Sequence, residues 1–271
     1  MPSTRPAEAA GGATRRGLLG LLAAGGLDPL VAQAGPPSHP TTTPTTGSIA
    51  MTTAIASLLS PARLALGPSA AATAAGDMAR LPAALHRGLD AGLDIGATKE
   101  ALVQLYAYAG FPRSLNALTV LMQVLEERRQ RGIQDPPGTP PGPVPVGAEL
   151  LEAGTANQTT LSGAPVRGPL FDFAPAIDRF LKTHLFGDIF ARDNLDWPSR
   201  ELVTVAALAA LPGVESQLAS HVRISLNVGI TPDQLRQLAE GLESAGQAEA
   251  GARLRAALDR PKTAGAGPAA R

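Results

Sequence analysis

The chain has 271 residues, with 23 basic and 23 acidic side chains and no cysteine. Balanced charge without a Lys/Arg stripe argues against a nucleic-acid-binding surface, and the absence of cysteine excludes disulfides, thiolate nucleophiles and cysteine-based zinc sites. Hydrophobic residues make up 44% of the chain, but only one Trp, two Tyr and six Phe are present. The interior must therefore consist mainly of Ala, Leu and Val at short helix separations, which favours an all-α fold.

The N-terminal residues are typical of a twin-arginine export signal. Arg15 and Arg16 stand directly before an apolar run over 18–27, and Ala32-Gln33-Ala34 offers a cleavage site of the small-x-small kind. We therefore expect a periplasmic or secreted protein, although Asp28 and Pro29 interrupt the apolar run, and a basic leader without signal function is the alternative. The run is too short for a permanent membrane span, and no other segment approaches twenty apolar residues.

Two stretches rich in Pro, Gly and Thr interrupt the chain: the first, 35–47, precedes two helical blocks, and the second lies between them. The second stretch, 134–168, is expected to sustain neither a helix nor a strand. The predicted organisation is an export signal over 1–34, a disordered linker over 35–49, a first repeat over 50–132, a Pro/Gly-rich linker over 133–169, a second repeat over 170–258 and a disordered tail over 259–271.

The first block contains three predicted helices. Helical periodicity over 77–92 places Met78, Leu81, Leu85 and Leu89 on the inward face, and helices over 98–109 and 113–129 follow. Gly110-Phe111-Pro112 is the expected break between the last two. The second block is expected to begin with one helix, lined on a single face by Phe173, Ile177, Phe180, Leu181 and Phe186.

Start and stop signals define three further helices. Asp196 is a candidate N-cap with Pro198 in the first turn, and Leu211-Pro212-Gly213 ends that helix. The next helix runs from about Val214 to a left-handed stop at Gly229. Thr231-Pro232-Asp233-Gln234 is a capping box that opens the last of the three.

Two of these helices each carry a polar group that their buried face does not need. Glu201 lies on the first helix, and His221 lies on the second in one stripe with Gln217 and Ser225. An acid and an imidazole from neighbouring helices could form a proton-transfer site. Both residues also have a purely structural interpretation. His221 could be a core histidine that hydrogen-bonds to Glu201 or to a backbone carbonyl, and Glu201 could only stabilise the start of its helix by its negative charge.

The two blocks look like related copies. The segment 85–93 aligns with 222–230, and each is followed by a short turn and another helix. In this register Ala84 takes the place of His221, and Glu201 has no counterpart in the first copy. The segment 104–112, in turn, matches only a weak remnant in the second copy. This pattern predicts a helical bundle built from two related repeats that share one composite site.

Three motifs carry a resemblance to a known family. They are QLYAYAGFPRSLN over 104–116, RELVT over 200–204 and QLxxHxxxxLNxGIT over 217–231. In this order they resemble the carboxymuconolactone decarboxylase family, in particular its double-domain members. The resemblance implies an alkylhydroperoxidase-D-like all-α bundle that associates as trimers or hexamers. Its members include a lactone decarboxylase of aromatic catabolism and thiol peroxidases.

The peroxidase members carry two cysteines just before the histidine, at places that fall near Val214 and Gln217 here, so this chain should not be a thiol peroxidase. The resemblance implies His221 and Glu201 as catalytic residues, with Gln217 and Asn227 in support. Further candidates for substrate binding are Tyr106 and two possible anchors for an acid group, Arg113 and Asn116. Because Tyr106 and Tyr108 are two residues apart on a helix, at most one of them borders a pocket.

No metal site is expected, since His184 has only Asp188 beside it at helical spacing. The leading hypothesis is a cofactor-free enzyme that decarboxylates or isomerises a small lactone or related carboxylic acid by acid–base chemistry. The alternative is a non-catalytic, oligomeric small-molecule-binding or assembly protein on the same fold. Export argues against the familiar catabolic role, because that pathway is normally intracellular.

Overall fold

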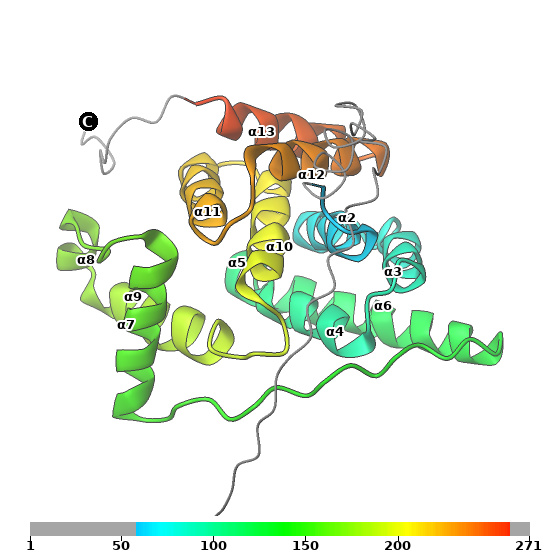
Figure 1. Cartoon of the computed structure of the whole chain (residues 1–271), viewed down its shortest axis with the longest axis horizontal. Coiled ribbons are helices and arrows are strands. Elements are labelled where there is room, and N and C mark those ends of the chain that lie inside the picture. The colour runs from blue at the N-terminus through cyan, green and yellow to red at the C-terminus, as the bar shows by residue number, and fades with distance from the viewer. Residues whose placement is uncertain (1–57, 261–271) are drawn as a thin grey trace, which may run out of the picture. The chain divides into compact units, whose positions relative to one another are not determined.

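The computed structural model describes residues 58–260, and every regular element within that range is a helix (Figure 1). This confirms the all-α prediction for the described residues. The export signal, the first linker and nearly all of the C-terminal tail lie outside them, so those predictions stay predictions. None of the helices in this range combines the length and the hydrophobicity that crossing a membrane requires.

The first half holds the helices α2 to α6, with bounds Pro61–Ala75, Leu81–Asp90, Ile95–Gln104, Tyr106–Ala109 and Phe111–Gln130. Their starts follow the local capping chemistry. Helix α3 begins four residues later than predicted, because Asp77 accepts a hydrogen bond from the backbone N–H of Arg80 and holds a turn. Helix α4 begins earlier than predicted, because Asp94 caps it by accepting from the N–H of Ala97 at 2.7 Å.

The prediction that 134–168 sustains no helix is wrong, because α7 spans Ala148–Ser162. The prolines of this stretch all lie outside those fifteen residues, so the average composition of the stretch concealed a segment without any helix breaker. The single internal glycine, Gly154, has a packing role. A Cβ atom there would lie 1.7 Å from the carbonyl oxygen of Lys182, so α7 approaches the next elements backbone to backbone.

The predicted apolar helix at the start of the second half is also wrong. The segment forms three pieces instead: α8 (Pro169–Phe173), α9 (Pro175–Phe180) and a π-helix, η1 (Leu181–Ile189). Phe173, Ile177 and Phe180 are exposed, and only the η1 end of the stripe, at Phe186, is buried. Pro175 interrupts the helix, so the apolar residues on either side of it do not form one inward face.

The last four helices are α10 (Trp197–Ala210), α11 (Glu215–Asn227), α12 (Pro232–Ser244) and α13 (Ala248–Leu258). The predicted signals at their ends are confirmed. Asp196 accepts a hydrogen bond from the N–H of Ser199 at 2.8 Å, Gly229 follows α11 with φ of +91°, and Thr231 and Gln234 form a capping box.

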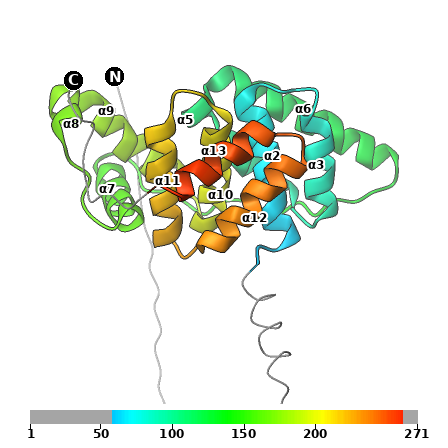
Figure 2. The same ribbon diagram turned by 90° about the horizontal axis from the view of Figure 1, so that it is seen from above.

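The main core joins the two halves of the chain. Helix α2 from the first half packs along α10 and α12 from the second (Figure 2). Contact is close because the facing side chains are small: Ala71, Ala206 and Ala207 have no exposed surface, and a Cβ at Gly67 would lie 2.4 Å from Leu238. A smaller apolar cluster joins α7, η1 and α11, with the members Leu161, Leu185, Phe186, Ile189, Phe190 and Ile224.

Candidate active site

Glu201 and His221 meet in the structure as the sequence predicted. Nδ1 of His221 lies 2.9 Å from Oε2 of Glu201. The carboxylate is fully buried, while the imidazole side chain is 11% exposed. A short turn joins α10 to α11, with Gly213 at φ of +81°, and it brings the first turns of α10 beside the middle of α11.

The geometry fixes how the imidazole can exchange protons. An ionised carboxylate only accepts hydrogen bonds, so the Nδ1 that faces Oε2 carries the proton in this contact. The other ring nitrogen, Nε2, has no hydrogen-bond partner among the described residues. A proton can therefore be taken up or released at Nε2 while Glu201 holds the ring and balances the charge of an imidazolium.

Tyr108 adds a third side chain from the other half of the chain. Its ring meets that of His221 edge to face, with the centroids 5.5 Å apart and an interplanar angle of 81°. The Tyr108 hydroxyl lies near Thr204, but neither it nor Oε1 of Glu201, which are both buried, makes a hydrogen bond of normal geometry. Burial, and secondly the charge of Glu201, raise the pKa of Tyr108 well above its usual value. Tyr108, and not Tyr106, is thus the tyrosine whose ring contacts His221, and the substrate-binding role of Tyr106 stays a prediction.

Tyr106 does not contact His221, because it lies on a different face of the short helix α5 from Tyr108. Its ring stacks on Phe111, with the centroids 4.3 Å apart. Asn227 is turned toward α7, where its Nδ2 donates to the carbonyl oxygen of Leu161 at 3.0 Å. Gln217 lies one turn before His221 but is exposed, and its Oε1 accepts a hydrogen bond from Ser216. None of these three side chains hydrogen-bonds to the pair.

The two proposed anchors for an acid group do not reach the pair either. The guanidinium of Arg113 donates to the carbonyl oxygen of Ala74 and thereby covers the last turn of α2. Asn116 is exposed on α6. Both residues follow the break at Gly110, where α6 begins, and their predicted anchoring role stays a prediction.

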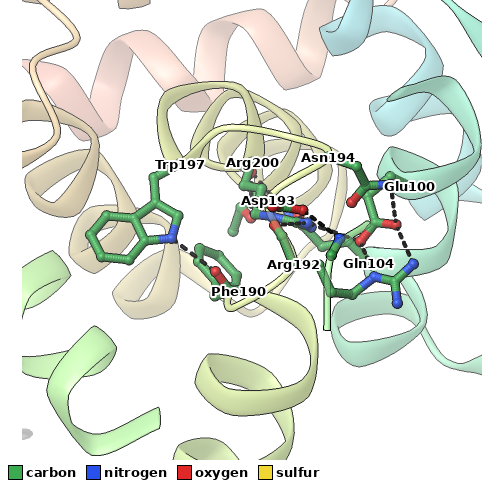
Figure 3. Close-up of polar contacts among 10 residues, drawn as sticks. Glu100, Gln104, Phe190, Arg192, Asp193, Asn194, Trp197 and Arg200 are labelled. Carbon is green, nitrogen blue, oxygen red and sulfur yellow. Dashed lines mark hydrogen bonds and ion pairs between the residues drawn. The ribbon is translucent and has the colours of Figure 1, made fainter. Parts of the chain in front are cut away.

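A buried ion cluster joins α4 to the start of α10 (Figure 3). Arg200, which has no exposed surface, donates to Oε1 of Glu100 at 2.9 Å and to Oε1 of Gln104 at 3.1 Å. Arg192 donates to both oxygens of the same carboxylate, at 2.8 and 2.9 Å, and Asn194 adds a bond of 3.1 Å. The cluster ties α4 to the start of α10, directly beside Glu201.

Burial alone would raise the pKa of Glu100, but the hydrogen bonds from Arg192 and Arg200 outweigh it and hold that pKa below its usual value. Burial lowers the pKa of Arg200, and Glu100 opposes that shift. Sequence reasoning missed this cluster. The signal present in the sequence was the acid Glu100 directly before three apolar residues, 101–103.

Among the hollows in the described part of the protein are two of about 420 and 570 Å³, and neither of these is lined by Glu201 or His221. The smaller is lined by residues around the η1 to α10 connection, including Arg192, Asp193 and Trp197. The pair reaches the surface through the edge of the imidazole instead.

His184 and Asp188 form an exposed contact of 2.7 Å, and no group of three metal-ligating side chains gathers among residues 58–260.

The part of the chain that carries the pair is similar to known proteins. Residues 175–260 match the model of the carboxymuconolactone decarboxylase family. A stretch of 69 residues is 38% identical to a 4-carboxymuconolactone decarboxylase of Acinetobacter baylyi, covering 26% of this chain and 51% of the relative. The chain thus spans about half the length of that relative. The matched residues include Glu201 and His221 but not Tyr108.

Proposed function

We propose that this protein is a cofactor-free lyase that decarboxylates, or isomerises, a small lactone or related carboxylic acid. The observation that carries the proposal is the 2.9 Å contact between Nδ1 of His221 and Oε2 of Glu201, inside the residues that match the family model. A 4-carboxymuconolactone decarboxylase among the similar proteins supports the substrate class. Peroxidase chemistry through a cysteine pair has no residues here, because the chain contains no cysteine.

Decarboxylation asks two things of the site. The bond to the departing carboxylate breaks, and its electron pair stays on the substrate, delocalised onto the lactone carbonyl. A proton must then reach a carbon atom of the delocalised system. Nε2 of His221 is placed to deliver it, and Glu201 stabilises the imidazolium form beforehand. Because Glu201 is fully buried, little water competes with this contact.

Two further points belong to the proposal. We propose export of the protein, supported by Arg15-Arg16 ahead of the apolar run, and self-association into trimers or hexamers, supported by the exposed Phe173 and Phe180. Measuring the mass of the protein in solution tests the self-association. Identifying the N-terminal residue of protein recovered outside the cytoplasm tests the export.

A second candidate is a non-catalytic small-molecule-binding or assembly protein on the same fold. The observation that favours it is the burial of Glu201 together with the position of both hollows away from the pair. In that case the contact between the two side chains would only satisfy a buried carboxylate.

The deciding experiment measures carbon dioxide release from 4-carboxymuconolactone by the wild type, His221→Ala and a control, His184→Ala, which removes an exposed imidazole. We expect activity in the wild type and the control, and a loss of about 100-fold or more in His221→Ala. Equal rates in all three would remove His221 from the mechanism. Binding without turnover, seen as a raised melting temperature with small lactones, would favour the second candidate.

A further inference from the structure

Two buried polar atoms next to His221 have no partner in the structure. They are the hydroxyl oxygen of Tyr108 on α5 and Oε1 of Glu201 on α10. Native proteins leave few buried polar atoms unpaired, because such an atom loses its bonds to water and gains none in return. Two such atoms lie beside one imidazole and come from opposite halves of the chain. This arrangement indicates that a bound molecule supplies the missing hydrogen-bond partner.

The Tyr108 hydroxyl is held where it is by strong bonds one turn away. Gln104 has no exposed surface, and its Nε2 donates to the carbonyl oxygen of Arg200 at 2.9 Å and to the Thr204 hydroxyl at 2.8 Å. Arg200 precedes Glu201 directly, and Thr204 follows it by about one turn. The helix segment that leads into Tyr108 is therefore fixed to the segment that carries Glu201.

Packing reinforces this position. The Tyr108 ring contacts both apolar clusters of the protein, and its edge-to-face contact with His221 sets the angle between the two rings. Tyr108 and the imidazole are both partly exposed, whereas the hydroxyl is not. A small molecule can therefore reach the two rings from solvent, and the hydroxyl lies beneath that surface.

We propose that Tyr108 is a catalytic residue of this site, whose hydroxyl donates a hydrogen bond to the oxyanion that forms on the substrate carbonyl as carbon dioxide leaves. The inference rests on the proposed function. The electron pair of the broken carbon–carbon bond moves onto the carbonyl oxygen, Tyr108 keeps its proton throughout, and the electrons return to carbon when His221 protonates it.

The electrostatics suit this role. Burial and the neighbouring charge of Glu201 raise the pKa of Tyr108, so the hydroxyl stays neutral and able to donate over the whole working pH range. An imidazolium at His221 would offset the negative charge of Glu201, which would otherwise repel an oxyanion at this place.

The first test compares turnover of 4-carboxymuconolactone by the wild type, Tyr108→Phe and a control, Thr119→Val. The control removes a hydroxyl on α6 that bonds only to the carbonyl oxygen of Leu115 in its own helix. We expect kcat of Tyr108→Phe to fall about 100-fold, with KM changed less than about threefold because the bond strengthens only in the transition state. The melting temperature should not fall, since an unpaired buried hydroxyl is removed. A kcat above half of the wild-type value would overturn the proposal, and so would a lowered melting temperature with kcat unchanged.

The second test does not depend on turnover. It measures binding of 4-nitrophenolate, a stable oxyanion, and of uncharged nitrobenzene to the wild type and Tyr108→Phe. The proposal predicts that Tyr108→Phe loses at least about tenfold in affinity for the phenolate and keeps its affinity for nitrobenzene. No phenolate binding by the wild type, or equal binding by both proteins, would overturn the assignment of Tyr108. A wild type that binds phenolate through Tyr108 yet releases no carbon dioxide would instead contradict the proposed reaction.

Discussion

Glu100 neutralises two arginines in the interior of this protein. Its carboxylate accepts hydrogen bonds from Arg192 and Arg200, and Arg200 has no exposed surface at all. Replacing one partner of a buried ion pair leaves the other charge without compensation, which typically costs about 3–5 kcal/mol. The cluster therefore makes the start of α10, where Glu201 lies, sensitive to a single residue on α4.

The pH dependence of stability provides a test at this residue. The pKa of Glu100 in the folded protein lies below its ordinary value of 4.5. Its contribution to the free energy of unfolding is thus complete above pH 4.5 and is lost as the pH falls through the folded-state pKa. We expect Glu100→Gln to unfold more easily at neutral pH by about 3 kcal/mol, and to lose less stability than the wild type on acidification below pH 4.5.

Denaturant unfolding at several pH values measures both effects, with Glu152→Gln as the control, because Glu152 is an exposed carboxylate on α7. If Glu100→Gln and Glu152→Gln gave the same stability and the same acid dependence, the cluster would have no part in holding α4 to α10.

At the scale of elements, α10 depends on how it begins. Asp196 caps the helix through the N–H of Ser199 and also contacts the guanidinium of Arg63 on α2. Asn caps a helix about as well as Asp but carries no charge, so the two roles can be separated by substitution. Half of the Asp196 side chain is exposed, which makes the ion pair the weaker contribution.

We expect Asp196→Ala to lower the free energy of unfolding by about 1 kcal/mol, and Asp196→Asn to lower it by much less. Thermal or denaturant unfolding measures the difference. Equal losses in the two variants would show that the contact with Arg63, and not the cap, stabilises the start of α10.

Elements with local signals were predictable from the sequence, whereas those decided by tertiary packing were not. The first residues of α10 and α12 could be predicted from Asp196 and Thr231. Each of these side chains accepts a hydrogen bond from the backbone N–H three residues later. Helix α7 has neither an N-capping side chain nor a strong amphipathic pattern, and its place depends on the contact of Gly154 with η1.

The same distinction applies to the site. Glu201 and His221 lie on consecutive helices joined by a short turn, so their meeting was predictable from local structure. Tyr108 comes from the first half of the chain. Its choice over Tyr106 was decided by the way α5 packs on α10, which helical spacing alone does not determine.

At the scale of the whole molecule, the two halves share one core, because α2 packs along α10 with Ala71 and Ala206 completely buried. Neither half can cover its own apolar surface alone, so the described part of the chain should unfold as one unit. The single tryptophan, Trp197, stands at the start of α10 and donates to the carbonyl oxygen of Phe190 at 2.9 Å, so it reports on the second half.

We expect the fluorescence of Trp197 and the far-ultraviolet circular dichroism of all helices to change at the same denaturant concentration. Separate transitions, with the fluorescence changing first, would mean that the second half unfolds independently of the first.

The central claim is that Glu201 and His221 act as one proton-transfer unit, and a double-mutant cycle tests it most directly. Carbon dioxide release from 4-carboxymuconolactone is measured for the wild type, Glu201→Gln, His221→Ala and the double variant. If the carboxylate works only through the imidazole, the double variant should be no more than about twofold slower than His221→Ala alone. Losses that multiply in the double variant, or a wild type that releases no carbon dioxide, would contradict the claim.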